Sequence, residues 1–131
     1  MPTINKKSGL RSWATRPKIV ATSWSDKDGA DFYNASAWRN CRKSYMDAHP
    51  LCEVSLSEKK HHAGKECDHI IPIRFGGAKY HPANLISLTV FYHRRKTGKE
   101  KARNAPIVAW VETEWGLVPK NRDELFGLLK R

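Results

Sequence analysis

Cys67-Asp68-His69-Ile70-Ile71-Pro72-Ile73 decides the fold, because two polar residues open a short apolar run that predicts a buried strand. Gly76-Gly77 marks the loop that follows this run. Leu85–Val90 is a second strand-like run, and Tyr92–Asn104 has the composition of a basic helix. The middle of the chain therefore predicts strand, loop, strand and helix, in that order.

Four polar residues lie at the ends of these predicted elements. Asp68 and His69 belong to the first strand, Asn84 closes the loop, and His93 lies near the start of the helix. A closed hairpin brings the first strand beside the helix, so Asp68 and His93 can point at one spot. A carboxylate oxygen and an imidazole nitrogen suit Mg²⁺, Mn²⁺, Ni²⁺ or Zn²⁺, with the remaining positions open to water and phosphate.

His69 follows Asp68 directly, so on a strand its side chain points to the opposite side. An imidazole with an ordinary pKa of about 6.5 suits a general base that acts on water near neutral pH. The amide of Asn84 can bind the backbone or the histidine.

The order of these residues resembles that of the HNH endonucleases, and the resemblance covers about residues 32–100. The matching blocks are Asp68-His69-Ile70-Ile71-Pro72, Gly76-Gly77, Asn84-Leu85, His93-Arg94-Arg95-Lys96-Thr97, and a preceding helix with Tyr33-Asn34, Ser36, Trp38-Arg39 and Arg42. The resemblance implies an α+β domain whose ββα-metal (His-Me finger) core has a preceding helix and a C-terminal helix.

The resemblance also implies a metal-dependent DNA endonuclease with one divalent ion. Asp68 and His93 would bind the metal, His69 would deprotonate the attacking water, and Asn84 would hold the loop and orient His69. The charge that develops on the phosphate and the leaving oxygen would be stabilised by the ion. Small phage members of the family often work beside packaging or mobile-element functions, which leads us to expect such an association here.

Basic residues are expected to contact DNA phosphates. The resemblance assigns this role to Lys96, with the flanking Arg94 and Arg95. Arg39 and Arg42 lie on the preceding helix and could face phosphate as well, although a solvated helix face explains them equally well.

The chain departs from the family at its cysteines. Many relatives hold a structural zinc with two cysteine pairs, but the corresponding positions here are Cys52 with Ser55, and Thr89 with Tyr92. We therefore expect no structural zinc and a finger held by packing. The irregular spacing of the three cysteines favours small buried hydrophobic residues over a disulfide framework.

Composition limits the partners. The 131 residues fit one domain, and 24 Lys and Arg against 13 Asp and Glu give a net charge of +11. A double-stranded DNA backbone suits such a surface, although a solvated basic surface or acidic lipid would also do. The sequence has neither a membrane-helix run nor the apolar region of a secretory signal, so we expect a cytoplasmic protein, in the bacterial host if it is phage-encoded.

The flanks complete the domain. Residues 1–30 predict a basic arm, parts of which pack on the domain through Trp13 and Trp24, with a possible strand at 19–21. Residues 31–131 form the nuclease domain, with its motif core at about 66–104.

Four further segments carry structural expectations. Asp31–His49 predicts one helix, capped by Asp31 or Asn34 and with Trp38 in the core. Leu51–Glu66 predicts an irregular segment, whose His61-His62 pair has no third ligand nearby for a metal. Ile107–Leu117 fits a strand or a helical turn equally well. Arg122–Leu129 predicts a last helix with Asn121 and Glu124 as its capping pair.

Two other functions fit the same sequence. One is a non-catalytic DNA-binding module on a retired nuclease fold, motivated by the basic arm and helix. The other is an accessory subunit of a DNA packaging or recombination machine, motivated by the tryptophan-rich C-terminal segment. The sequence does not determine the oligomeric state.

Overall fold

The computed structural model describes residues 24–130, which form an α+β domain of helices around two small antiparallel sheets. Trp13 and the possible strand at 19–21 lie outside the described residues. The elements are α1 (Asp26–Asn34), α2 (Ser36–Ala48), α3 (Glu53–Ser57), β1 (Glu66–His69), the 3₁₀ turns η1 (Ile73–Phe75) and η2 (Pro82–Asn84), β2 (Leu85–Leu88), α4 (Val90–Arg103), β3 (Trp110–Thr113), β4 (Gly116–Pro119) and α5 (Arg122–Lys130).

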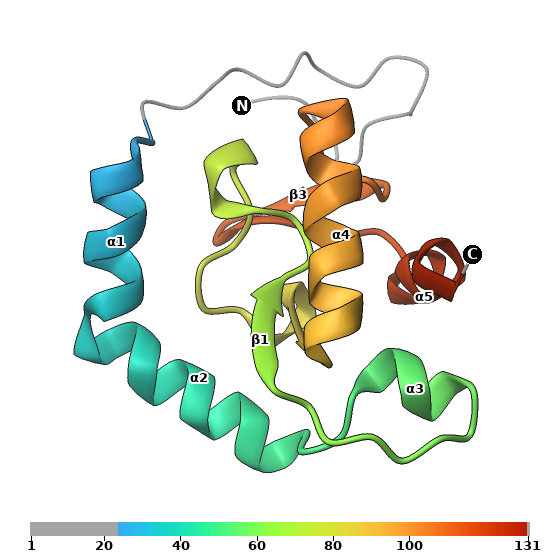
Figure 1. Ribbon diagram of the computed structural model, residues 1–131. Coiled ribbons are helices and arrows are strands. Elements are labelled where there is room, and N and C mark those ends of the chain that lie inside the picture. The colour runs from blue at the N-terminus through green and yellow to red at the C-terminus, as the bar shows by residue number, and fades with distance from the viewer. Residues whose placement is uncertain (1–23, 131) are drawn as a thin grey trace.

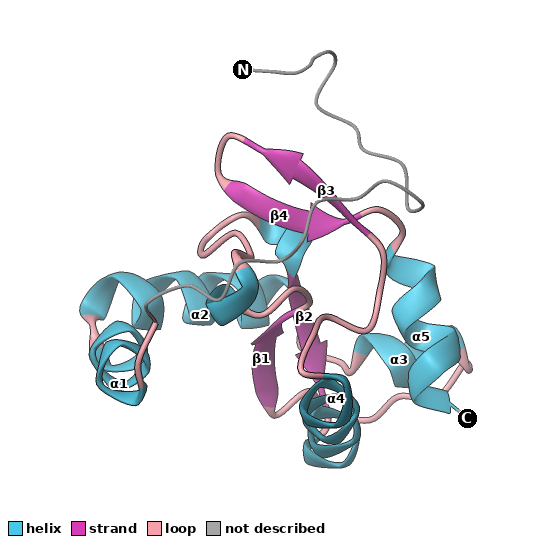
Figure 2. Ribbon diagram, turned by 90° about the horizontal axis from the view of Figure 1, so that it is seen from above, coloured by secondary structure: helices cyan, strands magenta, loops and turns pink. Residues whose placement is uncertain are grey.

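The centre of the domain is the predicted ββα unit. β1 pairs antiparallel with β2, so that Asp68 lies opposite Ile86. α4 packs against both strands, and Figures 1 and 2 show it lying alongside β1. The Thr89 hydroxyl accepts a hydrogen bond from the Tyr92 amide at 3.2 Å and caps α4, which explains why the helix takes Val90 from the predicted second strand.

The predicted first strand is too long at its C-terminal end. β1 stops at His69, and residues 73–75 turn into η1 instead of continuing the strand. Pro72 has no amide proton to donate to a neighbouring strand. Gly77 then passes so close to the strand end that a Cβ atom there would lie 1.7 Å from the Ile71 carbonyl oxygen, so only glycine fits.

The helix predicted over Asp31–His49 is two helices. Ala35 has an extended backbone (φ −73°, ψ 147°) and separates α1 from α2. The predicted caps are wrong, because α1 starts earlier, at a capping box in which Ser25 and Asp28 each bond the other's backbone amide. The predicted end of the basic arm at residue 30 therefore falls inside α1.

Two elements in the flanks were not specified by the sequence pattern. The segment predicted to be irregular contains the five-residue helix α3. The undecided segment after α4 forms the β3–β4 hairpin, in which Trp110 pairs with Pro119. At α5 the Asn121 side chain accepts from the Asp123 amide at 2.9 Å, whereas Glu124 accepts from the Ala109 amide at 3.1 Å and so ties the helix to the hairpin.

An ion pair joins the elements around the core. Glu53 on α3 accepts from Arg122 on α5 at 2.6 Å and from the Tyr45 hydroxyl on α2 at 2.6 Å. The Arg122 guanidinium also donates to the Leu85 carbonyl oxygen of β2 at 2.9 Å.

Trp38 is buried as predicted, at 4% exposure. Of the cysteines, Cys52 is buried, and Cys41 and Cys67 are half-buried.

No helix in the described part of the chain is both long enough and apolar enough to cross a bilayer.

Candidate active site

Asp68 is the carboxylate at the centre of the candidate site. Its Oδ1 accepts a hydrogen bond from the His69 amide at 2.8 Å. Its Oδ2 lies 3.9 Å from His93 Nε2 and 2.9 Å from Lys96 Nζ, both on α4. The strand and the helix thus bring Asp68 and His93 to one place, with side-chain exposures of 19% and 35% that leave both open to solvent.

The Asp68–His93 pair fits one divalent metal ion. Two metal–ligand bonds of about 2.0–2.2 Å can join atoms up to about 4.2 Å apart, and the 3.9 Å between Asp68 Oδ2 and His93 Nε2 lies within that limit. Among residues 24–130, no group of three or more His, Cys, Asp and Glu side chains is arranged to hold a metal. An ion bound at this pair would therefore keep most of its coordination positions for water and substrate oxygens.

His69 lies just behind this pair, with only 1% of its surface exposed. Its Nε2 is 2.9 Å from the Lys79 carbonyl oxygen. Because a carbonyl only accepts, Nε2 must carry the proton, which leaves Nδ1 as the basic nitrogen of the neutral ring. Burial lowers the pKa of His69, although the bond to Lys79 and the Asp68 charge oppose the shift. The ring is thus held in the neutral form that a base requires.

Aromatic rings from the first two helices surround His69. Trp38 lies 4.7 Å from the imidazole, centroid to centroid, and the Tyr33 hydroxyl lies 3.5 Å from Nδ1. Burial and the nearby Asp68 carboxylate raise the pKa of Tyr33 to about 12, so its hydroxyl stays protonated. The basic nitrogen of His69 therefore faces a neutral hydroxyl group.

Asn84 is fully buried and fastens the loop between the two strands. Its Oδ1 accepts from the Ile71 amide at 2.7 Å, and its Nδ2 donates to the carbonyl oxygens of Ile71 and Ala78 at 3.0 and 2.9 Å. It makes none of these bonds to His69. Asn84 thus bonds the residue just before Lys79, whose carbonyl oxygen meets the His69 ring, and connects to the histidine only through the loop backbone.

Lys96 differs from its predicted role as a surface phosphate contact. It is fully buried, and Nζ donates to Glu100 at 2.6 Å and to the His69 carbonyl oxygen at 2.8 Å, in addition to its ion pair with Asp68. Although burial pushes the pKa of Lys96 down, the two carboxylates raise it above its usual value, so the ammonium stays charged. The same ammonium keeps the pKa of Asp68 low against the effect of burial.

The four arginines predicted to contact phosphate lie on α2 and α4. Arg94 is exposed, and the Arg95 guanidinium lies over the Phe91 ring, 5.6 Å from its centre, within the reach of about 6 Å for a cation–π contact. Arg39 donates to the Asn34 carbonyl oxygen at 2.8 Å and braces the α1–α2 junction. Arg42 donates to the Lys65 carbonyl oxygen at 3.2 Å. Each keeps further N–H groups for a ligand.

Three residues of the site were not predicted to belong to it. Glu100 follows Lys96 by four positions, the helical spacing of an ion pair, and this signal could have identified it. Tyr33 lies in the helix that the family resemblance places before the motif. The break at Ala35, which leaves Tyr33 beside His69, has no clear signal in the sequence. Lys79 acts through its carbonyl oxygen, which every residue type has.

The comparisons with known proteins point to one group. Neither a family model nor a curated protein matches the chain. The fold is similar to the crystal structure of the HNH endonuclease of the deep-sea thermophilic bacteriophage GVE2 with manganese ion, at 29% sequence identity and a TM-score of 0.55. The match covers 60% of this chain and 87% of that one.

Proposed function

This chain belongs to the HNH-type nucleases, and we propose that it is a metal-dependent DNA endonuclease that hydrolyses phosphodiester bonds with one divalent ion and a histidine general base. The observation that carries the proposal is the Asp68–His93 pair, open to solvent, next to a buried His69 whose Nδ1 is free of a proton. The manganese ion in the similar phage structure supports a divalent cofactor. Its bacteriophage source supports a phage or mobile-element association.

In the proposed reaction His69 Nδ1 takes a proton from a water molecule, and the water oxygen attacks phosphorus as the bond to the leaving oxygen breaks. The Lys79 carbonyl oxygen, 2.9 Å from Nε2, stabilises the positive charge that the ring then carries. Tyr33 would contact the same water through its hydroxyl. A divalent ion bound at Asp68 and His93 would stabilise the negative charge on the phosphate and the leaving oxygen.

The arginines supply the phosphate contacts in this proposal. Arg94 and Arg95 lie on α4 with the metal ligand His93, and Arg39 and Arg42 lie on α2. Together with the net charge of +11, they favour a double-stranded DNA backbone as the ligand. The ammonium of Lys96 has a different part, which is to hold Asp68 in place at 2.9 Å.

A plasmid-cleavage assay tests the proposal. Wild type is incubated with Mg²⁺, Mn²⁺, Ni²⁺ or Zn²⁺ beside His69→Ala and the control His61→Ala, which changes an exposed histidine. Loss of a general base lowers the rate by about 10²–10⁴-fold, so His69→Ala should cut at least about a hundredfold more slowly while His61→Ala cuts normally. Equal cutting by wild type and His69→Ala, or no cutting by wild type with any of these metals, would refute the proposal.

A DNA-binding module without catalysis is the second candidate, and one observation favours it. Lys96 already neutralises Asp68, which weakens the attraction of that carboxylate for a metal ion. Calorimetric titration with Mn²⁺ separates the two functions. The enzyme binds one ion in wild type and loses it in Asp68→Asn or His93→Ala, whereas the module binds no ion and shows only salt-sensitive affinity for DNA.

A further inference from the structure

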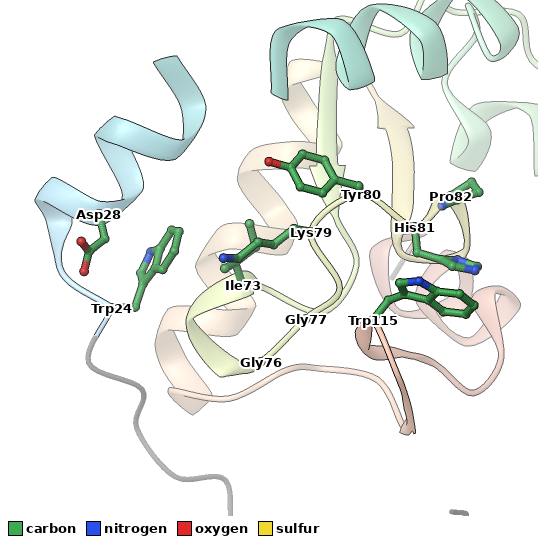
Figure 3. Close-up of a pocket in the computed structure, with 10 residues that line it drawn as sticks. All are labelled: Trp24, Asp28, Ile73, Gly76, Gly77, Lys79, Tyr80, His81, Pro82 and Trp115. Carbon is green, nitrogen blue, oxygen red and sulfur yellow. The ribbon is translucent and has the colours of Figure 1, made fainter. Parts of the chain in front are cut away.

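A groove of about 740 Å³ opens on the outer side of the loop that holds His69. Four aromatic side chains line it, namely Trp24, Tyr80, His81 and Trp115, together with Lys79 and the glycine pair of the loop. Figure 3 shows Trp24 on one side and Trp115 beside His81 on the other, with Lys79 between them. We call it the aromatic groove. Asp68, His69 and His93 do not line it, so the proposed chemistry does not account for it.

Two of the four rings of the aromatic groove are exposed, and the other two are half-buried. Trp115 is 61% exposed and Tyr80 is 46% exposed, although large aromatic side chains contribute most to stability when they are buried. Trp115 lies 5.0 Å from the His81 ring at an angle of 38°, which fixes one platform in place. At the other end Lys79 Nζ lies 5.6 Å from the centre of the Trp24 ring. The aromatic groove thus has the flat rings of Trp24 and of the Trp115–His81 pair, with the Lys79 ammonium between them.

The charges of the groove suit a nucleobase better than a phosphate at its Trp24 end. Asp28 lines that end, and hydrogen bonds from Ser25 lower the pKa of its carboxyl, so it stays negative and repels phosphate. A carboxylate instead accepts from the amino groups of a base. Lys79 lies between this end and the Trp115–His81 pair, where it can meet the sugar–phosphate backbone of a base that stacks on that pair. The chain's charge of +11 favours a polyanion over an apolar peptide as the source of the ligand.

A second cavity adjoins the aromatic groove. A smaller cavity of about 180 Å³ shares Trp24 and Ile73 with it and is lined by Glu100 and Lys101 of α4. Glu100 bonds Lys96, which bonds Asp68. Tyr33 also lines this smaller cavity, and its hydroxyl lies 3.5 Å from His69 Nδ1, so the two cavities extend from the aromatic groove to a residue that contacts His69.

We propose that the aromatic groove binds an unpaired base of the DNA strand, stacked on Trp115 and His81. The proposal rests on the proposed function for its ligand, since it takes DNA to be the substrate. A base within an intact duplex has both faces covered by its neighbours, so the groove would select DNA with a bulged, flipped or single-stranded nucleotide. A fully paired duplex would bind only through the arginines.

Binding is tested in EDTA, where no metal-dependent cutting can occur. The probes are a fully paired duplex and the same duplex with one unpaired 2-aminopurine, whose fluorescence falls when it stacks on an aromatic ring. The variants are Trp115→Ala, Trp115→Phe and the control Phe91→Ala, which removes a ring of equal 61% exposure on α4, outside the groove. Trp115 donates through its backbone amide to Thr113, so the substitutions keep the turn.

Stacking contributes enough affinity per base for alanine to weaken binding by about 5- to 150-fold. We expect Trp115→Ala to weaken binding of the bulged duplex by this factor and restore the fluorescence of the bulged base, while the paired duplex binds as before. Trp115→Phe should keep most of the effect, and Phe91→Ala should leave the preference for the bulged duplex unchanged.

Three results would overturn the proposal: equal affinity of wild type for the two duplexes, an unchanged bulge preference in Trp115→Ala, or the same loss in Phe91→Ala. Any of them would leave the groove to a protein partner. The proposed nuclease function fails separately, in the plasmid assay with metal, because this binding assay contains none.

Discussion

Replacing Lys96 with methionine isolates the energetic role of the buried ammonium. The side chain is fully buried, and its Nζ neutralises Asp68 at 2.9 Å and Glu100 at 2.6 Å. Methionine fills a similar volume but leaves two carboxylates without a cation. Removing one partner of a buried pair costs about 3–5 kcal/mol, and we expect Lys96→Met to lose that much unfolding free energy at about pH 8, where Glu100 is charged in the wild type.

Urea unfolding in EDTA measures this loss. With a slope of about 2 kcal/mol per molar urea, the midpoint should fall by about 2 M. Lys99→Met, on the same helix, should change stability by less than about 0.5 kcal/mol. The double variant Lys96→Met with Glu100→Gln should recover part of the loss, because it leaves Asp68 as the one unpaired carboxylate of the three-residue cluster. A loss below about 1 kcal/mol in Lys96→Met, or no recovery in the double variant, would refute this account of the cluster.

Three further predictions concern Glu100, Arg122 and the glycines Gly77 and Gly98. Burial raises the pKa of Glu100 from 4.5 to about 7, so between these pH values the folded state holds a proton that the unfolded state releases. The unfolding free energy of the wild type should therefore fall as the pH rises from 4.5 to about 7. Urea unfolding across this range should show that Glu100→Gln removes the fall. Arg122→Met should lose about 1.5–3 kcal/mol because it strips the charged partner from Glu53, and Arg122→Lys should lose less, as measured by thermal unfolding. Gly77→Ala should lose about 3 kcal/mol through its clash with the loop backbone, whereas Gly98→Ala, with open space around it on α4, should gain about 0.5–1 kcal/mol in the same thermal assay.

The sequence predicted the centre of the fold well, because local signals and long-range packing agree there. The apolar run after His69, the glycine pair of the loop and the basic helix each have a strong local pattern, and hairpin closure brings Asp68 to His93 without further information. The ends of the helices are set by side-chain hydrogen bonds that the hydrophobic pattern does not show. Thr89 caps α4 and takes Val90 from the strand, and the Ser25–Asp28 capping box starts α1 early.

Burial could not be predicted for side chains whose environment depends on distant partners. A lysine in a basic helix is usually solvated, and Lys96 is buried because Asp68 comes from another element and Glu100 lies one turn away. The pairing of Glu53 with Arg122 joins residues 69 positions apart, which no local pattern connects. The same limit applies to the aromatic groove, since Trp24 and Trp115 line it together although they are 91 positions apart in the chain.

The positions where the family's zinc cysteines would be expected show how packing can hold this finger together. Cys52 and Ser55 are buried at α3, and Tyr92 packs against the core beside Cys52. The Tyr92 hydroxyl donates to Glu58 at the end of α3, at 3.0 Å, so a hydrogen bond joins the two segments that a zinc ion would join. Just before Ser55, the Glu53 carboxylate accepts from the Ser87 amide of β2 at 2.9 Å. The short helix α3 is thereby fastened to both strand β2 and helix α4 of the ββα unit, and α4 is the helix that carries His93.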